Sequence, residues 1–86
     1  RPARFGDLSG RRDGFAVRCG QFVARYATRA EADAAAETAV EAYAAWLRAE
    51  AVAAGLAPEA VTRDGLTVTS PAGAETFTVE PCEVFA

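Results

Sequence analysis

The chain has 86 residues, an apolar fraction of 51% and a formal net charge of −3. It contains no histidine, so the commonest catalytic base and metal ligand are absent, and no glycine-rich phosphate-binding loop occurs. Its two cysteines are too few for a structural zinc site or a disulfide framework. We therefore expect a non-enzymatic protein that binds no cofactor and no metal.

The composition also bears on location. No apolar stretch approaches the roughly 20 residues of a membrane span, so we expect no membrane association. All nine basic residues are arginine and alanine is abundant, which is typical of high-GC bacterial or phage genomes. We expect a small acidic protein in the bacterial cytoplasm, with Cys19 and Cys82 as free thiols and a single bridge between them as the alternative.

Positive charge is concentrated at the start of the chain. Residues 1–30 hold seven arginines and two aspartates, a net +5, whereas residues 31–86 hold two arginines and ten carboxylates, a net −8. We expect one domain over residues 1–86 with one basic and one acidic surface. Residues 1–12 show no periodicity and predict a basic arm or loop, pinned by Phe5 and Leu8.

Residues 14–27 predict a β-hairpin, because apolar and polar residues alternate on both sides of a glycine. A two-residue turn at Cys19-Gly20 would pair Val17 with Phe22. Apolar side chains then share the core face. The opposite face consists of Arg18, Gln21, Val23 and Arg25.

Residues 28–54 predict one long helix, in which 13 of 27 positions are alanine. Thr28 and Glu31 form a capping box at its start, and Gly55 ends it. At about 100° per residue, one apolar stripe faces the core. This stripe comprises Ala32, Ala36, Ala39, Val40, Tyr43, Trp46, Leu47 and Ala54.

Glu50 interrupts the stripe. The helix would span about 40 Å, whereas a globule of this size is about 30 Å across. We expect either that the last turns overhang the sheet and leave Glu50 in solvent, or that Glu50 is buried and paired with an arginine such as Arg63. Tyr43 and Trp46 are expected in the core, with an exposed aromatic patch at a homodimer interface as the alternative.

The rest of the chain predicts short elements. A helical turn begins near Pro58, with Leu56 and Val61 buried, and Asp64-Gly65 forms a turn. Residues 66–85 predict a second hairpin with its loop at residues 71–74. The order ββαββ predicts an α+β fold, in which the long helix packs on one face of an antiparallel sheet of about four strands.

Three carboxylates form a candidate binding ridge. Asp33, Glu37 and Glu41 lie at i, i+4 and i+8, about 6 Å apart along one line of the helix. No arginine lies four residues after any of them, and the flanking alanines leave the ridge open. The ridge is either a solubilising face or a docking site for a basic protein surface, such as one that normally binds nucleic acid.

Arginines offer a competing nucleic-acid-binding surface. The candidate residues are Arg11, Arg12, Arg18, Gln21 and Arg25. The stretch GFAVRCGQFVARYATRAEADAAAETA resembles the ββα module of integrase arm-binding and AP2-type DNA-binding domains, over residues 13–48. That resemblance implies that side chains of the exposed sheet face enter the major groove. The acidic helix and tail would oppose the phosphate backbone.

In size, acidity and lack of a motif, the chain resembles the anti-CRISPR class of phage inhibitors. Those proteins share no common motif, so no residue role is transferred from them. The resemblance implies an inhibitor whose acidic ridge docks on a basic nucleic-acid-binding surface of a CRISPR effector complex. The alternatives are the ββα DNA-binding domain and a small assembly protein that dimerises through the helix, so the chain is expected to be a monomer or a homodimer.

Overall fold

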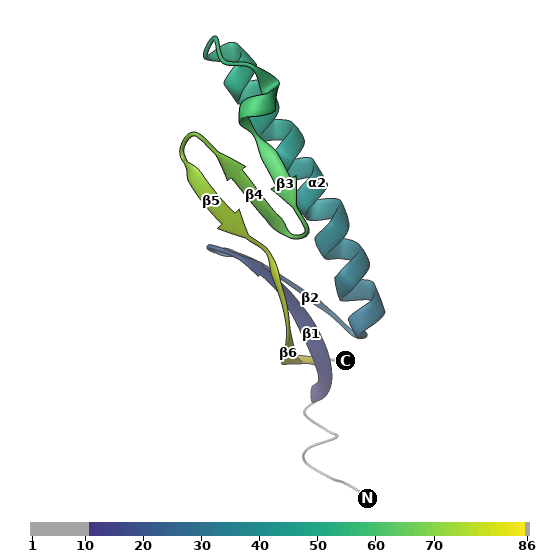
Figure 1. The fold of residues 1–86 in the computed structure, drawn as a ribbon. Helices are drawn as coiled ribbons and strands as arrows, with labels where there is room; N and C mark the ends of the chain where they lie inside the picture. Colours follow the sequence, from purple (N-terminus) through teal and green to yellow (C-terminus); the bar gives the residue numbers. More distant parts are fainter. Residues whose placement is uncertain (1–10, 86) are drawn as a thin grey trace, which may run out of the picture.

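The computed structural model describes residues 11–85 (Figure 1). The elements are β1 (Arg11–Cys19), β2 (Phe22–Tyr26), α2 (Arg29–Ala53), η1 (Pro58–Ala60), β3 (Thr62–Asp64), β4 (Thr67–Ser70), β5 (Gly73–Thr76) and β6 (Thr78–Phe85). Here η1 is a single 3₁₀ turn. The predicted arm lies outside the described residues except for Arg11 and Arg12, which begin β1.

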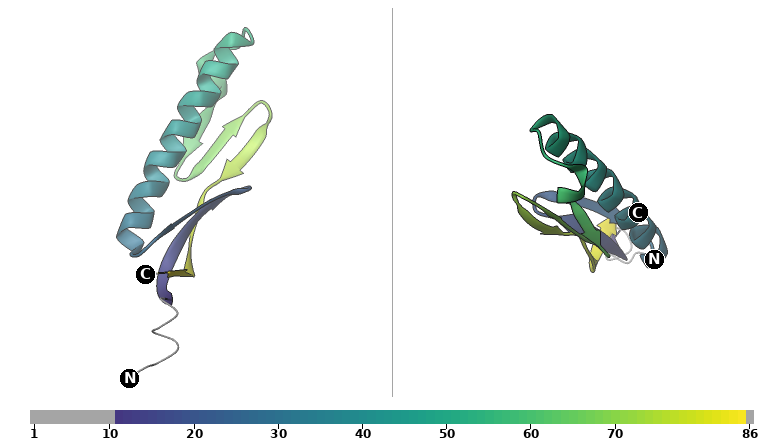
Figure 2. Two further views of the ribbon diagram at one scale, coloured as in Figure 1. Left: turned by 180° about the vertical axis from the view of Figure 1, so that it is seen from behind. Right: turned by 45° about the horizontal axis from the view of Figure 1, so that its top comes forward.

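The strands form two antiparallel sheets, in the orders β2-β1-β6 and β3-β4-β5. Both sheets lie on the same side of α2, the first beside its N-terminal turns and the second beside its middle, where Arg63 of β3 reaches Glu37 and Glu41 (Figures 1 and 2). The α+β class is thus confirmed, whereas a single sheet of about four strands is wrong. The chain divides at Phe77: β5 pairs with β4, but β6 pairs with β1 instead of closing the predicted hairpin.

The β1–β2 hairpin keeps the predicted faces with a different turn. Cys19 pairs with Phe22 and Val17 with Ala24, so the turn consists of Gly20 and Gln21. Gly20 has a φ of 61°, as the first central residue of a type II′ turn requires. The observed turn lies one residue later than predicted, so each residue of β1 pairs with a residue two positions further along β2. An even shift keeps the paired side chains on their predicted faces, whereas Gln21 moves from the sheet face into the turn.

Both ends of α2 are capped as predicted. The Thr28 hydroxyl accepts from the Glu31 amide at 3.1 Å, and the Thr28 amide donates to the Glu31 carboxylate at 3.2 Å. At the other end the Leu56 amide donates to the Ala51 carbonyl at 2.8 Å, and Gly55 has a φ of 85°. This is a Schellman motif, for which glycine is the preferred residue.

The core is built mainly from alanine and valine. Its buried side chains are Ala16, Val17, Ala32, Ala36, Val40, Ala44, Ala51, Val61, Val68 and Phe77. Val61 is buried as predicted, but Leu56 is 47% exposed. The helix is also rotated from the predicted stripe, because Ala44 and Ala51 are buried while Trp46 is 57% exposed and Ala54 is exposed. With alanine on every side of the helix, periodicity alone does not fix which side faces the sheets.

The described chain is elongated. Its radius of gyration is 17.3 Å, compared with about 12 Å for a globule of this length. The last turns of α2 extend past the strands of the second sheet and lie beside η1 (Figure 1), where Ala51 is only 7% exposed. Glu50 is nevertheless exposed and is not the partner of Arg63.

Candidate functional site

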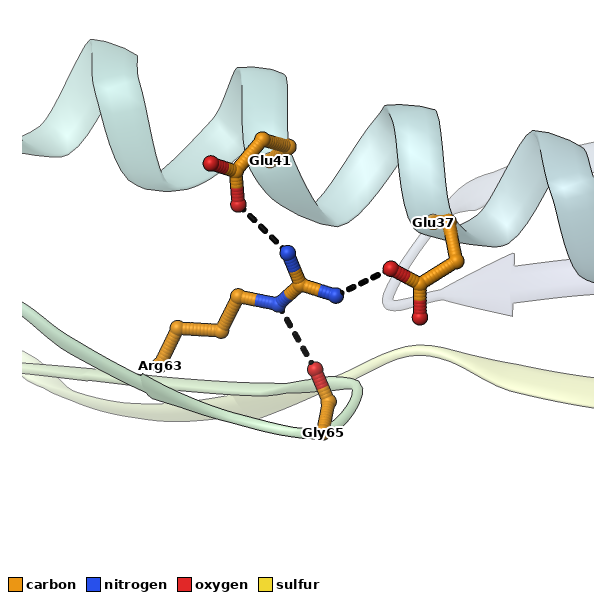
Figure 3. A network of polar contacts seen from close by, with 4 residues as sticks. All are labelled: Glu37, Glu41, Arg63 and Gly65. Carbon is orange, nitrogen blue, oxygen red and sulfur yellow. Dashed lines mark hydrogen bonds and ion pairs between the residues drawn. The ribbon is translucent and has the colours of Figure 1, made fainter.

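The acidic ridge is joined to the second sheet by Arg63 of β3 (Figure 3). The Arg63 guanidinium donates to Glu37 and to Glu41, each at 2.5 Å, and its Nε donates to the Gly65 carbonyl at 2.8 Å. Hydrogen bonds to Glu37 first and Glu41 second raise the pKa of Arg63. The fork shape of guanidinium allows one side chain to serve both carboxylates.

The ridge is therefore not a row of free carboxylates. Arg29 lies 3.7 Å from Asp33, so each of the three acidic side chains has a basic neighbour. Local sequence spacing missed Arg63, which lies 22 residues after Glu41. One sequence feature could have pointed to this partner: Arg48 and Arg63 are the only arginines after residue 30.

The arginines of the first sheet share a face with a carboxylate. Arg18 and Arg25 lie on the face of β1 and β2 opposite to Val17, which packs in the core with residues of α2. Arg18 donates to Glu80 of β6 at 2.8 Å. Ala16 of β1 pairs with Arg25 on one side and with Glu80 on the other, so Glu80 shares this face with both arginines. Gln21 lies in the hairpin turn. Only part of the predicted nucleic-acid surface is therefore brought together, and Glu80 weakens its attraction for phosphate.

An exposed apolar surface runs along the side of α2 opposite its buried stripe. We call it the outer helix face, and it consists of Ala42, Ala45, Trp46, Ala49, Val52 and Ala53. These residues lie within about 120° of the helix circumference. Trp46 is 57% exposed and Val52 is 55% exposed. Neither sheet covers this side of α2 (Figures 1 and 2).

Aromatic rings connect this face to the first sheet. Trp46 stacks on Tyr43 with ring centroids 6.1 Å apart. Tyr43 contacts Phe77 edge to face at 6.0 Å, and Phe77 contacts Phe22 in the same way at 6.3 Å. Phe22 is 48% exposed. The cluster thus runs from a buried ring to two solvent-exposed rings, and sequence analysis assigned its helical members to the core.

A pocket of about 490 Å³ opens beside these rings, between the β1–β2 turn, α2 and β5. We call it the hairpin pocket, and its lining includes Cys19, Phe22, Ala42, Tyr43, Glu75 and Phe77. The Cys19 thiol donates to Glu75 at 3.6 Å. Burial, and then the Glu75 carboxylate, raise the pKa of Cys19 and of Tyr43. Apolar walls therefore surround one carboxylate.

Carboxylates lie on both sides of the outer helix face. A shallow hollow on one side is lined by Glu37, Glu41, Ala45 and Arg63, so the ridge and its paired arginine adjoin the face directly. On the other side Ala42 also lines the hairpin pocket, which contains Glu75. The arrangement combines an apolar strip with acidic borders.

Two further observations concern the described residues. Within residues 11–85, no group of three or more cysteine, aspartate or glutamate side chains is placed to hold a metal ion. The helix α2 lacks the length and apolar character needed to cross a membrane. Comparison of the chain with protein-family models, with curated proteins and with solved structures gives no match.

Proposed function

We propose that this protein is a non-enzymatic binding protein whose outer helix face holds a basic amphipathic segment of another protein. The observation that carries the proposal is the exposure of Trp46 and Val52 on one uncovered side of the only helix longer than one turn in the described chain. Solvent-exposed apolar strips bordered by charge are typical of protein interaction sites. The elongated shape adds support, since a longer helix face offers more contact area.

The acidic borders favour a basic partner over a second copy of the chain. Residues 31–86 carry a net −8, from two arginines and ten carboxylates. Two copies joined through α2 would bring these segments together, and like charges across an interface oppose binding. A segment with one apolar side and flanking basic residues would instead meet Glu37 and Glu41 on one border and Glu75 on the other.

The anti-CRISPR-type inhibitor is a special case of this proposal, in which the basic partner is a nucleic-acid-binding surface of an effector complex. It needs the ridge carboxylates to accept the partner's arginines or lysines. Because Arg63 already occupies Glu37 and Glu41, an incoming cation must share or displace that guanidinium. The apolar strip therefore supplies the contact, and the ridge supplies attraction at a distance.

The proposal can be tested by calorimetric titration with a helical peptide of leucine, alanine and lysine that has one apolar side. A second peptide with glutamate in place of lysine keeps the apolar side and reverses the charge. We expect saturable binding of the lysine peptide and no measurable binding of the glutamate peptide, because the borders of the face are acidic.

Two matched variants separate apolar docking from simple charge attraction. Ala49→Glu places a carboxylate in the middle of the outer helix face and should weaken lysine-peptide binding at least about tenfold. Ala30→Glu adds the same charge in the exposed first turn of α2 and should leave affinity unchanged or slightly improved. Stronger binding by both variants would show that charge alone drives association, and the proposal would fail. Dimerisation of the protein alone, lost on Ala49→Glu, would favour a second copy as the occupant.

A further inference from the structure

Glu75 occupies a position where the sheet pattern calls for an apolar residue. It lies opposite Val68 on β4, and Val68 is fully buried against α2. Alternation along β5 turns Ala74 and Thr76 to the other face of the sheet, so Glu75 points toward the helix side. Because β5 is an edge strand, this carboxylate reaches the hairpin pocket and not the core.

Three aromatic rings line the hairpin pocket together with Glu75. Phe77 is 6% exposed and lies innermost. The rings of Phe22 and Tyr43 are inclined to it at 63° and 66°, so they do not close over the pocket as a parallel stack would. One oxygen of Glu75 accepts from Cys19, and no described arginine pairs with this carboxylate.

We infer that the hairpin pocket binds an arginine side chain of the partner protein, with the guanidinium between Glu75 and the rings of Phe22 and Tyr43. Guanidinium is the side chain that both forms forked hydrogen bonds to a carboxylate and stacks on aromatic faces. The inference rests on the proposed function, because the pocket borders the outer helix face through Ala42. The inference adds an arginine-specific site to the outer helix face, which otherwise binds through apolar contact and through charge attraction that does not distinguish arginine from lysine.

The test uses a probe that does not depend on the partner. N-acetyl-arginine amide is titrated into ¹⁵N-labelled protein, and amide shifts are followed in two-dimensional NMR spectra. N-acetyl-citrulline amide, which has nearly the same shape without the charge, is the matched ligand. We expect saturable shifts at Gly20, Gln21, Phe22 and Glu75 with the arginine probe, in the millimolar range, and none with citrulline.

Variants locate the binding in the pocket. Glu75→Gln should raise the dissociation constant of the arginine probe at least about fivefold, and Phe22→Ala should raise it in the same direction. Glu59→Gln removes an exposed carboxylate of η1 and should change nothing. Equal shifts with citrulline, or equal affinity of the Glu75→Gln protein, would overturn the inference.

The two proposals fail separately. The peptide used to test the outer helix face contains lysine and no arginine, so its binding is independent of an arginine-specific pocket. If the peptide binds and the arginine probe does not, the pocket inference is wrong and the proposed function stands. If the probe binds and the peptide does not, the pocket is real and the outer helix face is not its companion surface.

Discussion

Trp46 stacks on Tyr43, the aromatic residue three positions before it on α2, with ring centroids 6.1 Å apart and an interplanar angle of 25°. Tyr43 also contacts the buried ring of Phe77, whereas Trp46 is 57% exposed. Tyr43 therefore fixes the position of an exposed indole without burying it. A rigid aromatic side chain held in solvent loses little conformational entropy on binding, which is why tryptophan is frequent among the residues that dominate interface energies.

The burial pattern of α2 predicts unequal effects for two identical changes on one helix. Val40 is fully buried and Val52 is 55% exposed. We expect Val40→Ala to lower the free energy of unfolding by about 1–3 kcal/mol, and Val52→Ala to change it by less than about 0.5 kcal/mol. Urea titrations followed by circular dichroism measure both. Equal losses would mean that the outer helix face is buried in solution and would contradict the observed exposure of Val52.

The Arg63 fork predicts a stability effect that depends on salt. Arg63→Met removes the charge and leaves Glu37 and Glu41 one helical turn apart without their shared cation. We expect Arg63→Met to have a lower urea midpoint than the unmodified protein in dilute buffer. The difference between the two midpoints should become smaller in 1 M NaCl, because salt screens exposed ion pairs.

Arg48→Met is the control for the loss of an arginine, since no described ion pair involves Arg48. If the difference in urea midpoint between Arg63→Met and the unmodified protein does not change with salt, the Arg63 side chain stabilises the fold by packing and not by its charge.

The raised pKa of Cys19 predicts slow alkylation, because only the thiolate reacts. In a Cys82→Ser background, Glu75→Gln should lower that pKa and speed iodoacetamide labelling at pH 8 by about two- to fivefold. The same shift affects stability, because the pKa of Cys19 is higher in the folded than in the unfolded protein. The contribution of Cys19 to the free energy of unfolding is fully present below the unfolded pKa and is lost as pH rises through the folded pKa. The labelling rate of Glu59→Gln should be unchanged, and an unchanged rate in Glu75→Gln would place the carboxylate away from the thiol.

Local signals in the sequence predicted much of the fold. The capping box at Thr28, the helix end at Gly55 and the faces of the first hairpin depend on residues close together in the chain, and all three are confirmed. The pairing of β6 with β1 joins residues 60 to 74 positions apart, and alternation along a strand does not identify its partner. For that reason two sheets were predicted as one.

The candidate site was harder to predict. Asp33, Glu37 and Glu41 were correctly placed on the helix surface, but their pairing with Arg63 depends on where β3 packs. Trp46 was assigned to the core because it falls in the apolar stripe predicted from helical spacing. In a helix whose inward positions are mostly alanine, close approach to the sheets leaves no room for an indole.

The most direct measurement of the central proposal is acrylamide quenching of Trp46, the only tryptophan, with and without the lysine peptide. The free protein should show strong quenching, since the indole is exposed. Saturating peptide should lower the quenching constant at least about twofold, because the centre of an interface excludes water. An unchanged constant, under conditions where calorimetry shows the peptide to be bound, would mean that binding occurs elsewhere on the protein and would contradict the account.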